Sequence, residues 1–142
     1  MTWVVDTCVL LDLACNDKTF AGCASRAIQS KIDDVLTVAP LTYVELAPQF
    51  LGDATRQDEF LHALWIECDF DGSRDAVLAA HKAWYEHITR KRAGQVVKRP
   101  IADIVIGAYA MQKGGLITRN EADFRSLYPN LTIFNPDSSS MP

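Results

Sequence analysis

Residues 3–14 read Trp3-Val-Val-Asp-Thr-Cys-Val-Leu-Leu-Asp-Leu-Ala14, and this stretch decides the fold class. Its first three residues are an apolar run, which predicts a short buried strand over residues 2–6. Beyond Asp6 the apolar residues recur at helical spacing, which predicts a helix over residues 7–14. A buried strand that leads directly into a helix is typical of the β-α-β units that build parallel sheets.

The rest of the chain continues this alternation of strands and helices. Further strands are predicted at residues 35–39, 116–118 and 131–134. Helices are predicted at residues 18–32, 42–50 (limited or kinked by Pro48), 53–64, 73 or 75 to 92, and 101–113. The pattern predicts an α/β fold in which helices cover the faces of a mostly parallel sheet. We expect one domain over residues 1–136 and a flexible C-terminal tail over residues 137–142.

Length and charge limit the class of protein. The chain has 142 residues, the size of one domain, and a formal net charge of −4. No apolar run reaches the ~20 residues of a membrane span, and the N-terminus lacks the basic and apolar parts of a signal peptide. We therefore expect a cytoplasmic protein with no membrane partner. The negative charge argues against broad binding to nucleic acids, although a local basic cluster precedes Asp103. This cluster consists of Arg90, Lys91, Arg92, Lys98 and Arg99.

The four cysteines give no sign of a zinc or redox site. None forms a Cys-x-x-Cys pair, and no nearby His has zinc-ligand spacing. We interpret them as reduced, buried thiols that act as small apolar side chains. They are Cys8, Cys15, Cys23 and Cys68.

Four acidic residues adjoin apolar segments, where acids are rare unless they are paired or bind a metal. Asp6 ends the first predicted strand, and Glu45 lies in the helix after the second. Asp103 lies in the first turn of its helix, and Asp123 follows the strand at residues 116–118. Ligands of open α/β sheets bind beyond the carboxyl ends of the strands, and all four acids can converge there.

Converging carboxylates favour a bound cation. Two carboxylates about 4 Å apart repel each other by about 4 kcal/mol at an effective dielectric constant near 20. A hard divalent ion with oxygen ligands, Mg²⁺ or Mn²⁺, relieves this repulsion. Such an ion supplies a nucleophilic water and stabilises negative charge on a phosphodiester oxygen. The four acids therefore predict metal-assisted hydrolysis of phosphodiester bonds.

Four segments resemble the motifs of PIN-domain nucleases and occur in the order of that family. They are Val4-Val-Asp-Thr-Cys-Val-Leu-Leu11, Tyr43-Val-Glu-Leu46, Ile101-Ala-Asp-Ile-Val-Ile-Gly-Ala-Tyr-Ala110 and Gly115-Leu-Ile-Thr-Arg-Asn-Glu-Ala-Asp-Phe124. The last of these is the most specific match, and the segment Leu131-Thr-Ile-Phe-Asn-Pro136 resembles the final strand of the family. Because the motifs span residues 4–136, the resemblance implies a PIN-like three-layer sandwich.

The compact size resembles the VapC-like toxins of prokaryotic toxin–antitoxin modules. This resemblance implies a Mg²⁺-dependent endoribonuclease that forms a homodimer and is held inactive by a cognate antitoxin, whose C-terminal segment covers the active site. It implies that the catalytic metal ligands are Asp6, Glu45, Asp103 and Asp123. It also implies that Thr7, Thr118 and Asn120 support them. Cys8 stands where relatives often carry a small polar residue. The candidates for binding RNA are Arg90, Arg92, Lys98, Arg99 and Arg119.

Simpler interpretations exist for several of these residues. Asp6 is also a suitable N-cap for the helix that starts at Thr7, and Asp123 for a helix at residues 124–127. Glu45 could be merely solvated, and Arg119 could pair with a neighbouring carboxylate instead of RNA. Residues 90–92 could simply complement a helix dipole instead of binding RNA.

The assembly also has more than one interpretation. An apolar stripe on the longest helix predicts packing in the core or against a second subunit, with base stacking by Trp84 as the alternative. The stripe consists of His81, Trp84, Tyr85 and Ile88. Together with Leu10, Leu11 and Leu13, this helix gives more apolar surface than one small sheet needs, which favours a homodimer.

Two other functions fit parts of the pattern. A catalytically idle PIN-like module would bind RNA or protein, but the presence of all four acids argues against it. A phospho-acceptor signalling domain would need an acidic partner beside Asp6 and a Lys after the strand at residues 131–134. The chain has neither.

Overall fold

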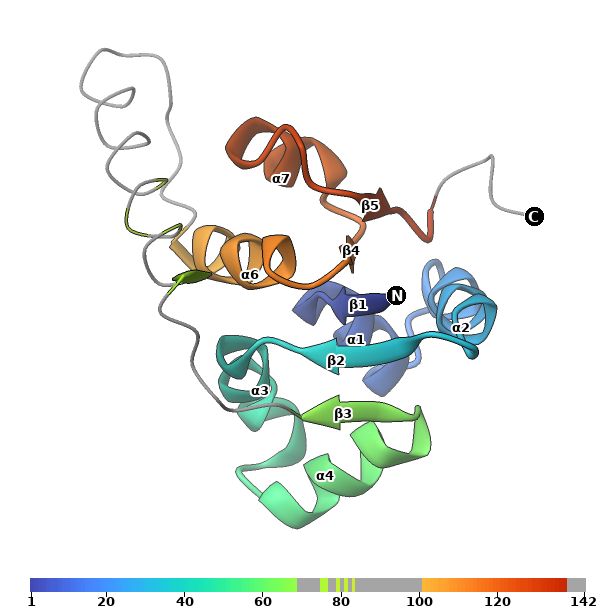
Figure 1. Cartoon of the computed structure of the whole chain (residues 1–142). Coiled ribbons are helices and arrows are strands. Elements are labelled where there is room, and N and C mark those ends of the chain that lie inside the picture. The colour runs from blue at the N-terminus through green and yellow to red at the C-terminus, as the bar shows by residue number, and fades with distance from the viewer. Residues whose placement is uncertain (69–74, 77–78, 80, 82, 84–100, 138–142) are drawn as a thin grey trace.

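The computed structural model of the chain describes residues 1–68, 75, 76, 79, 81, 83 and 101–137. Within these residues, five parallel strands form one sheet in the order β3-β2-β1-β4-β5 (Figure 1). The strands are β1 (Thr2–Val5), β2 (Val35–Val38), β3 (Ile66–Cys68), β4 (Gly115–Ile117) and β5 (Ile133–Phe134). The first strand, β1, lies at the centre of the sheet, so its carboxyl end at Val5 has a neighbouring strand on each side.

Helices cover both faces of this sheet. They are α1 (Thr7–Ala14), α2 (Ala21–Ser30), α3 (Pro40–Glu45), α4 (Ala54–Ala63), α6 (Ile101–Met111) and α7 (Glu121–Leu127), with a 3-10 helix, η1 (Ala47–Phe50). One apolar core joins one face of the sheet to α1, α2 and α4, and a second joins the other face to α6 and α7. Val5 lies in the first core and Val4 in the second, as the alternation of side chains along a strand requires. The predicted three-layer α/β sandwich with a parallel sheet is confirmed.

The apolar stripe of α1 lies in the first core. Leu10 is fully buried there, and Leu11 and Leu13 are partly buried against it. Burying one such side chain stabilises a fold by about 1.5–3 kcal/mol, so α1 is held firmly on the sheet. Leu10 is therefore a core residue and provides no spare apolar surface for a dimer, whereas Leu11 and Leu13 remain partly exposed.

Three details differ from the sequence-based expectation. The helix predicted at residues 42–50 is divided into α3 and η1, with Pro48, which lacks an N–H, in the first turn of η1. The edge strand β3 was not predicted. The helix α2 begins at Ala21 instead of residue 18, because the Asp17 carboxylate accepts hydrogen bonds from the backbone N–H groups of Thr19 and Phe20 and holds a turn there.

The cysteines are only partly as expected. All four are free thiols, but Cys15 and Cys68 are exposed and the other two are half-buried. The prediction that they are buried is therefore wrong for the exposed pair. Cys15 follows the last residue of α1, and Cys68 ends an edge strand, so neither is covered by a second layer.

Some expectations fall outside the described residues. These are most of the helix predicted at residues 73–92, the basic cluster at residues 90–99 and the C-terminal tail beyond residue 137. Among the residues that are described, no helix is long and apolar enough to cross a membrane.

Candidate functional site

The candidate site is built around Asp6, at the carboxyl end of the central strand. Its backbone N–H donates to the carbonyl oxygen of Ile117 at 2.9 Å, which extends the pairing of β1 with β4 by one residue. Its side chain is only 3% exposed. One carboxylate oxygen, Oδ1, accepts a hydrogen bond from the backbone N–H of Thr7 at 2.8 Å and caps α1. The predicted capping role is thus confirmed, and it uses only half of the carboxylate.

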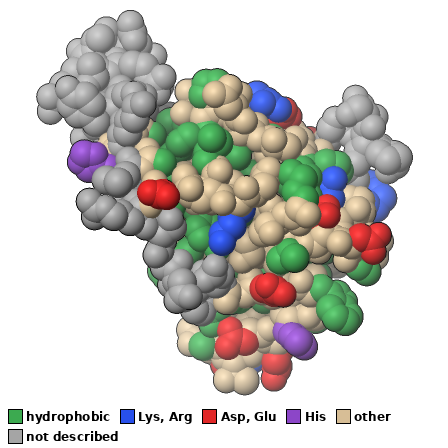
Figure 2. Space-filling view, viewed as in Figure 1, with side chains coloured by type: hydrophobic (Ala, Val, Ile, Leu, Met, Phe, Trp, Pro, Cys, Tyr) green, Lys and Arg blue, Asp and Glu red, His purple; other side chains and the backbone are tan. Residues whose placement is uncertain are grey.

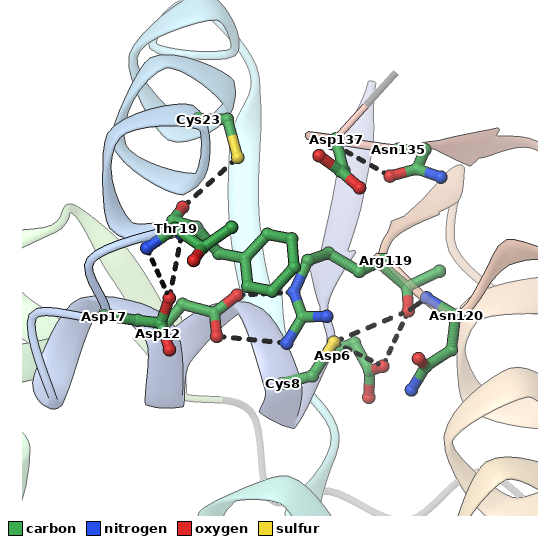
Figure 3. A network of polar contacts seen from close by, with 12 residues as sticks. Asp6, Cys8, Asp12, Asp17, Thr19, Cys23, Arg119, Asn120, Asn135 and Asp137 are labelled. Atoms are coloured by element: carbon green, nitrogen blue, oxygen red, sulfur yellow. Dashed lines mark hydrogen bonds and ion pairs between the residues drawn. The ribbon is translucent and has the colours of Figure 1, made fainter. Parts of the chain in front are cut away.

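The second oxygen of Asp6 binds two side chains. Oδ2 accepts a hydrogen bond from Thr118 Oγ1 at 2.7 Å. It also accepts one from Cys8 Sγ at 3.3 Å (Figure 3). Thr118 is fully buried directly after β4, so a second strand end contributes to the site. Thr118 thus contacts one of the acids that it was expected to support, and its role beside a metal stays a prediction.

The carboxylate of Asp6 lies in an environment that disfavours its charge. Burial raises the pKa of Asp6 above the ordinary value of 3.8, against the effect of the hydrogen bonds from Thr118, Cys8 and Thr7. The negative charge of Glu45 raises this pKa further. Burial and the nearby Asp6 also raise the pKa of the Cys8 thiol to about 12, so this thiol stays protonated and able to donate. A cation beside Asp6 would favour the ionised carboxylate.

Thr7 connects Asp6 with the second acid, Glu45. Its backbone N–H binds Asp6, while its hydroxyl donates to Glu45 Oε1 at 2.7 Å and lies 3.0 Å from Thr42 Oγ1. Glu45 is the last residue of α3 and is exposed. Thr7 therefore joins a buried carboxylate, Asp6, to an exposed one, Glu45, at one edge of the sheet.

The other two acids lie on the helices of the second layer. Asp103 is half-buried in the first turn of α6, which packs against α3, the helix that ends at Glu45. Asp123 is exposed in the first turn of α7. Because α7 begins at Glu121 and Asn120 occupies its N-cap position, the interpretation of Asp123 as the cap of a helix at residues 124–127 is wrong. The backbone N–H of Asn120 donates to Thr118 Oγ1 at 3.0 Å.

These donors fit a hydrated hard cation better than a closed cage. Among the described residues, which include all four acids, no three Asp, Glu, His or Cys side chains form a group that could hold a metal ion. Mg²⁺ usually keeps several waters and is held by one or two carboxylates. The pair of Asp6 and Glu45, joined through Thr7, provides such oxygen ligands. The complete set of four ligands stays a prediction.

Arg119 lies next to the site but is already paired. Its Nε donates to Asp12 Oδ2 at 2.6 Å and its Nη2 to Asp12 Oδ1 at 3.1 Å, and its guanidinium lies 3.9 Å from the centre of the Phe20 ring. Of the two roles considered for Arg119, pairing with a carboxylate is confirmed. The other RNA-binding candidates, at residues 90–99, lie outside the described residues. On the face shown in Figure 2, basic side chains are interspersed with acidic ones.

The sequence interpretation missed three members of this site, namely Asp12, Phe20 and Thr42. A signal existed for Asp12, because it is an acid within the apolar stripe of α1, and the same criterion selected the other four acids. No comparable signal marks Phe20 or Thr42, whose roles depend on contacts between segments far apart in the chain.

Comparison with known proteins identifies structures with the same fold. No protein-family profile and no curated protein sequence matches the chain. It is similar to a chain in the 2.2 Å structure of VapBC-1 from nontypeable Haemophilus influenzae, with 23% identity, a TM-score of 0.70, and coverage of 97% of this chain and 100% of that one. It is also similar to a chain of VapBC2 from Rickettsia felis, solved with a DNA fragment from their promoter, with 16% identity, a TM-score of 0.65, and coverage of 95% and 98%. The chain therefore has the PIN-domain fold of these VapBC proteins, as its motifs predicted.

Proposed function

We propose that this protein is a Mg²⁺- or Mn²⁺-dependent endoribonuclease that hydrolyses RNA phosphodiester bonds. The observation that carries the proposal is the buried carboxylate of Asp6 at the end of the central strand, with a raised pKa and with Glu45 joined to it through Thr7. Buried acids of this kind are common at catalytic sites and rare elsewhere. The PIN-domain fold supports the same proposal, because Asp6 and Thr118 follow two adjacent parallel strands, β1 and β4, and hydrogen-bond each other.

The roles of the residues follow from their contacts. Asp6 and Glu45, with Asp103 and Asp123, would hold the metal ion, which when bound supplies a water of lowered pKa and stabilises charge on a phosphodiester oxygen. Thr118 and Thr7 orient the Asp6 carboxylate by donating to its two oxygens, and the Thr7 hydroxyl orients Glu45. Because Asp6 is almost fully buried, its charge acts through a medium of low dielectric constant and attracts a cation more strongly than an exposed acid does.

We further propose that the protein is the toxin of a toxin–antitoxin pair. Both structural neighbours are parts of VapBC assemblies, and one of these was solved with a DNA fragment from their promoter. A cognate antitoxin would keep the nuclease inactive by covering the edge of the sheet at which Asp6 and Glu45 lie. A homodimer is the proposed assembly of the toxin itself.

A cleavage assay tests the enzymatic proposal. Protein purified free of any antitoxin should cleave RNA with Mg²⁺ or Mn²⁺, lose this activity in excess EDTA and regain it when the metal is restored. Asp6→Asn, prepared in the same way, should be nearly inactive, which excludes a contaminating nuclease. The matched control is Glu59→Gln, a change of an exposed acid in α4, which should keep full activity.

Two outcomes would contradict the proposal. Undiminished cleavage in EDTA would exclude a metal-dependent reaction, and equal cleavage by the Asp6 variant would exclude this site. RNA binding without any cleavage would instead favour a catalytically idle PIN-like module.

A further inference from the structure

An ion pair joins the helix after the first strand to the loop after the fourth. Arg119 in the loop donates two hydrogen bonds, of 2.6 and 3.1 Å, to the two carboxylate oxygens of Asp12 in α1. Asp12 is only 6% exposed, so its charge depends on this partner. The flat guanidinium also stacks on Phe20, which precedes α2. Arg119 is thus held on two sides, in the geometry that a planar fork favours.

The same loop also makes hydrogen bonds around the Asp6 carboxylate. Thr118, directly before Arg119, donates its hydroxyl to Asp6 Oδ2 at 2.7 Å. The backbone N–H of Asn120, directly after it, donates to that same threonine hydroxyl at 3.0 Å. The Cys8 thiol donates to Asp6 Oδ2 at 3.3 Å, and its sulfur lies 3.8 Å from Thr118 Oγ1. Figure 3 shows Arg119 reaching Asp12 while Asp6, Cys8 and Asn120 lie on its other side.

Two further features of this loop bear on how it is held. The backbone N–H of Thr118 donates to Phe134 on β5, a strand of two residues at the edge of the sheet. The side chain at the N-cap position of α7, Asn120, makes no capping hydrogen bond. The side-chain pair of Arg119 and Asp12 therefore ties the loop to α1, the helix that Asp6 itself caps.

We propose that Asp12 and Arg119 act together as a positioning clamp, which holds the loop at residues 118–120 against α1 and so keeps the Asp6 carboxylate in the orientation that a metal ligand requires. This inference rests on the proposed function, because it assigns the two residues to the site at which the metal would bind. Arg119 is then a positioning residue, and it is not free to contact RNA while the pair is formed. Partners that orient a ligand commonly change metal affinity or activity 10–100-fold when they are removed.

The test compares two single variants with their double variant. Asp12→Asn and Arg119→Gln remove the charge of one partner each and keep its approximate shape. The matched control is Arg125→Gln, which breaks an exposed Arg–carboxylate pair with Glu121 at 3.0 Å on the neighbouring α7. For each protein, RNA cleavage is measured as a function of substrate and Mg²⁺ concentration. Amide hydrogen exchange is measured at Thr7, which donates to Asp6, and at Asn120, with amides of α4 as reference.

The clamp predicts the same phenotype for both single variants. Each should need about 10–100-fold more Mg²⁺ or lose kcat by that factor, with an unchanged KM for RNA. The double variant should be no worse than either single one, because both changes break one interaction. The amides of Thr7 and Asn120 should exchange about tenfold faster relative to α4, and Arg125→Gln should match the unmodified protein.

Different results would overturn the clamp. A higher KM for Arg119→Gln, with normal cleavage by Asp12→Asn, would show that Arg119 contacts RNA. Unchanged exchange at Thr7 and Asn120 in both single variants would show that the pair does not hold the loop, even if the protein proves not to cleave RNA. If Arg119→Gln unfolds, Arg119→Lys takes its place, because lysine keeps the positive charge but lacks the planar guanidinium. Its cleavage activity is compared with that of the unmodified protein below the melting temperature of the variant. Full activity of Arg119→Lys would also exclude the clamp.

Discussion

Asp6 combines two roles that place opposite demands on one carboxylate. As the N-cap of α1 it needs an oxygen that accepts from the Thr7 N–H, and an uncharged group can do this equally well. As a metal ligand it needs a negative charge, which burial disfavours and the neighbouring Glu45 disfavours further. The charge therefore lowers the stability of the metal-free fold, and a reason for keeping it is ligation.

This conflict leads to a prediction for Asp6→Asn in EDTA. The asparagine oxygen keeps the cap, and the amide removes the buried charge, so the melting temperature at neutral pH should equal or exceed that of the unmodified protein. The folded-state pKa of Asp6 is raised above 3.8, so the folded protein holds the proton more tightly than the unfolded chain. The destabilisation by the charge is thus absent below 3.8 and grows as the pH rises through the folded-state pKa.

Thermal melts from about pH 4 to about pH 8 measure this difference. The advantage of Asp6→Asn should be smallest at the acidic end of this range and should grow with pH until Asp6 is ionised in the folded protein. A lower melting temperature of the variant at every pH would show that the carboxylate serves mainly as a structural cap.

Thr7 offers a second test at this scale. Thr7→Val keeps the shape of the side chain but removes the hydroxyl that donates to Glu45 at 2.7 Å and lies beside the buried Thr42. Losing this donor should lower cleavage about 10–100-fold. The unsatisfied hydroxyl of Thr42 should lower the free energy of unfolding by about 1–3 kcal/mol. Thr7→Ser, which restores the hydroxyl, should recover both, and equal activity of the valine and serine variants would exclude a role for this bond.

Helices α6 and α7 carry two of the predicted ligands, and Tyr128 joins them closely. Tyr128, after α7, donates its hydroxyl to the carbonyl oxygen of Ile104 in α6 at 2.7 Å. Its ring lies over Gly107, where an added Cβ would come within 2.5 Å of Tyr128 Cε2. The absence of a side chain at Gly107 therefore allows the two helices to pack and sets where Asp123 lies relative to Asp103.

Gly107→Ala should consequently be destabilising, although alanine is the better helix former. Overpacking of this kind lowers the free energy of unfolding by about 1–3 kcal/mol. The control is Gly22→Ala in α2, where the new Cβ would meet only Arg26 at an ordinary 3.5 Å and should be neutral or stabilising by up to about 1 kcal/mol. Chemical denaturation compares the two. Equal stability of both variants would mean that Tyr128 moves away without cost.

The elements differ in how far local sequence predicts them. The strands β1, β2 and β4 were predictable because each consists mostly of apolar residues, and α1 because its apolar residues recur at helical spacing. The edge strand β3 was not, since it has three residues, Glu67 and Cys68 are exposed, and it exists through pairing with β2. Asp6 and Glu45 could be predicted from their apolar surroundings and the motifs, whereas the contacts of Thr7 with Thr42 and of Arg119 with Phe20 join distant segments.

For the molecule as a whole, the proposed function poses an electrostatic problem. A chain with a formal net charge of −4 would have to hold a polyanion beside Asp6 and Glu45. Local field matters more than total charge, so a basic groove shared by two subunits would solve the problem. The candidates for its lining are Arg90, Arg92 and Arg99, since Arg119 already pairs with Asp12. Leu10 is fully buried in the monomer, so of the three leucines only the partly buried Leu11 and Leu13 could contribute to such a dimer.

The last prediction is that the protein is a dimer whose RNA affinity falls as the salt concentration rises. Light scattering at micromolar concentration should give twice the mass of one chain. Each phosphate contact contributes about −0.7 to the slope of log K against log salt for single strands, so Arg92→Gln should weaken binding and make this slope shallower by about that amount. Arg56→Gln, a change of an exposed arginine in α4, should alter neither quantity. A monomer whose RNA affinity does not respond to salt would exclude the shared groove, because its basic side chains could not then be neutralising phosphates.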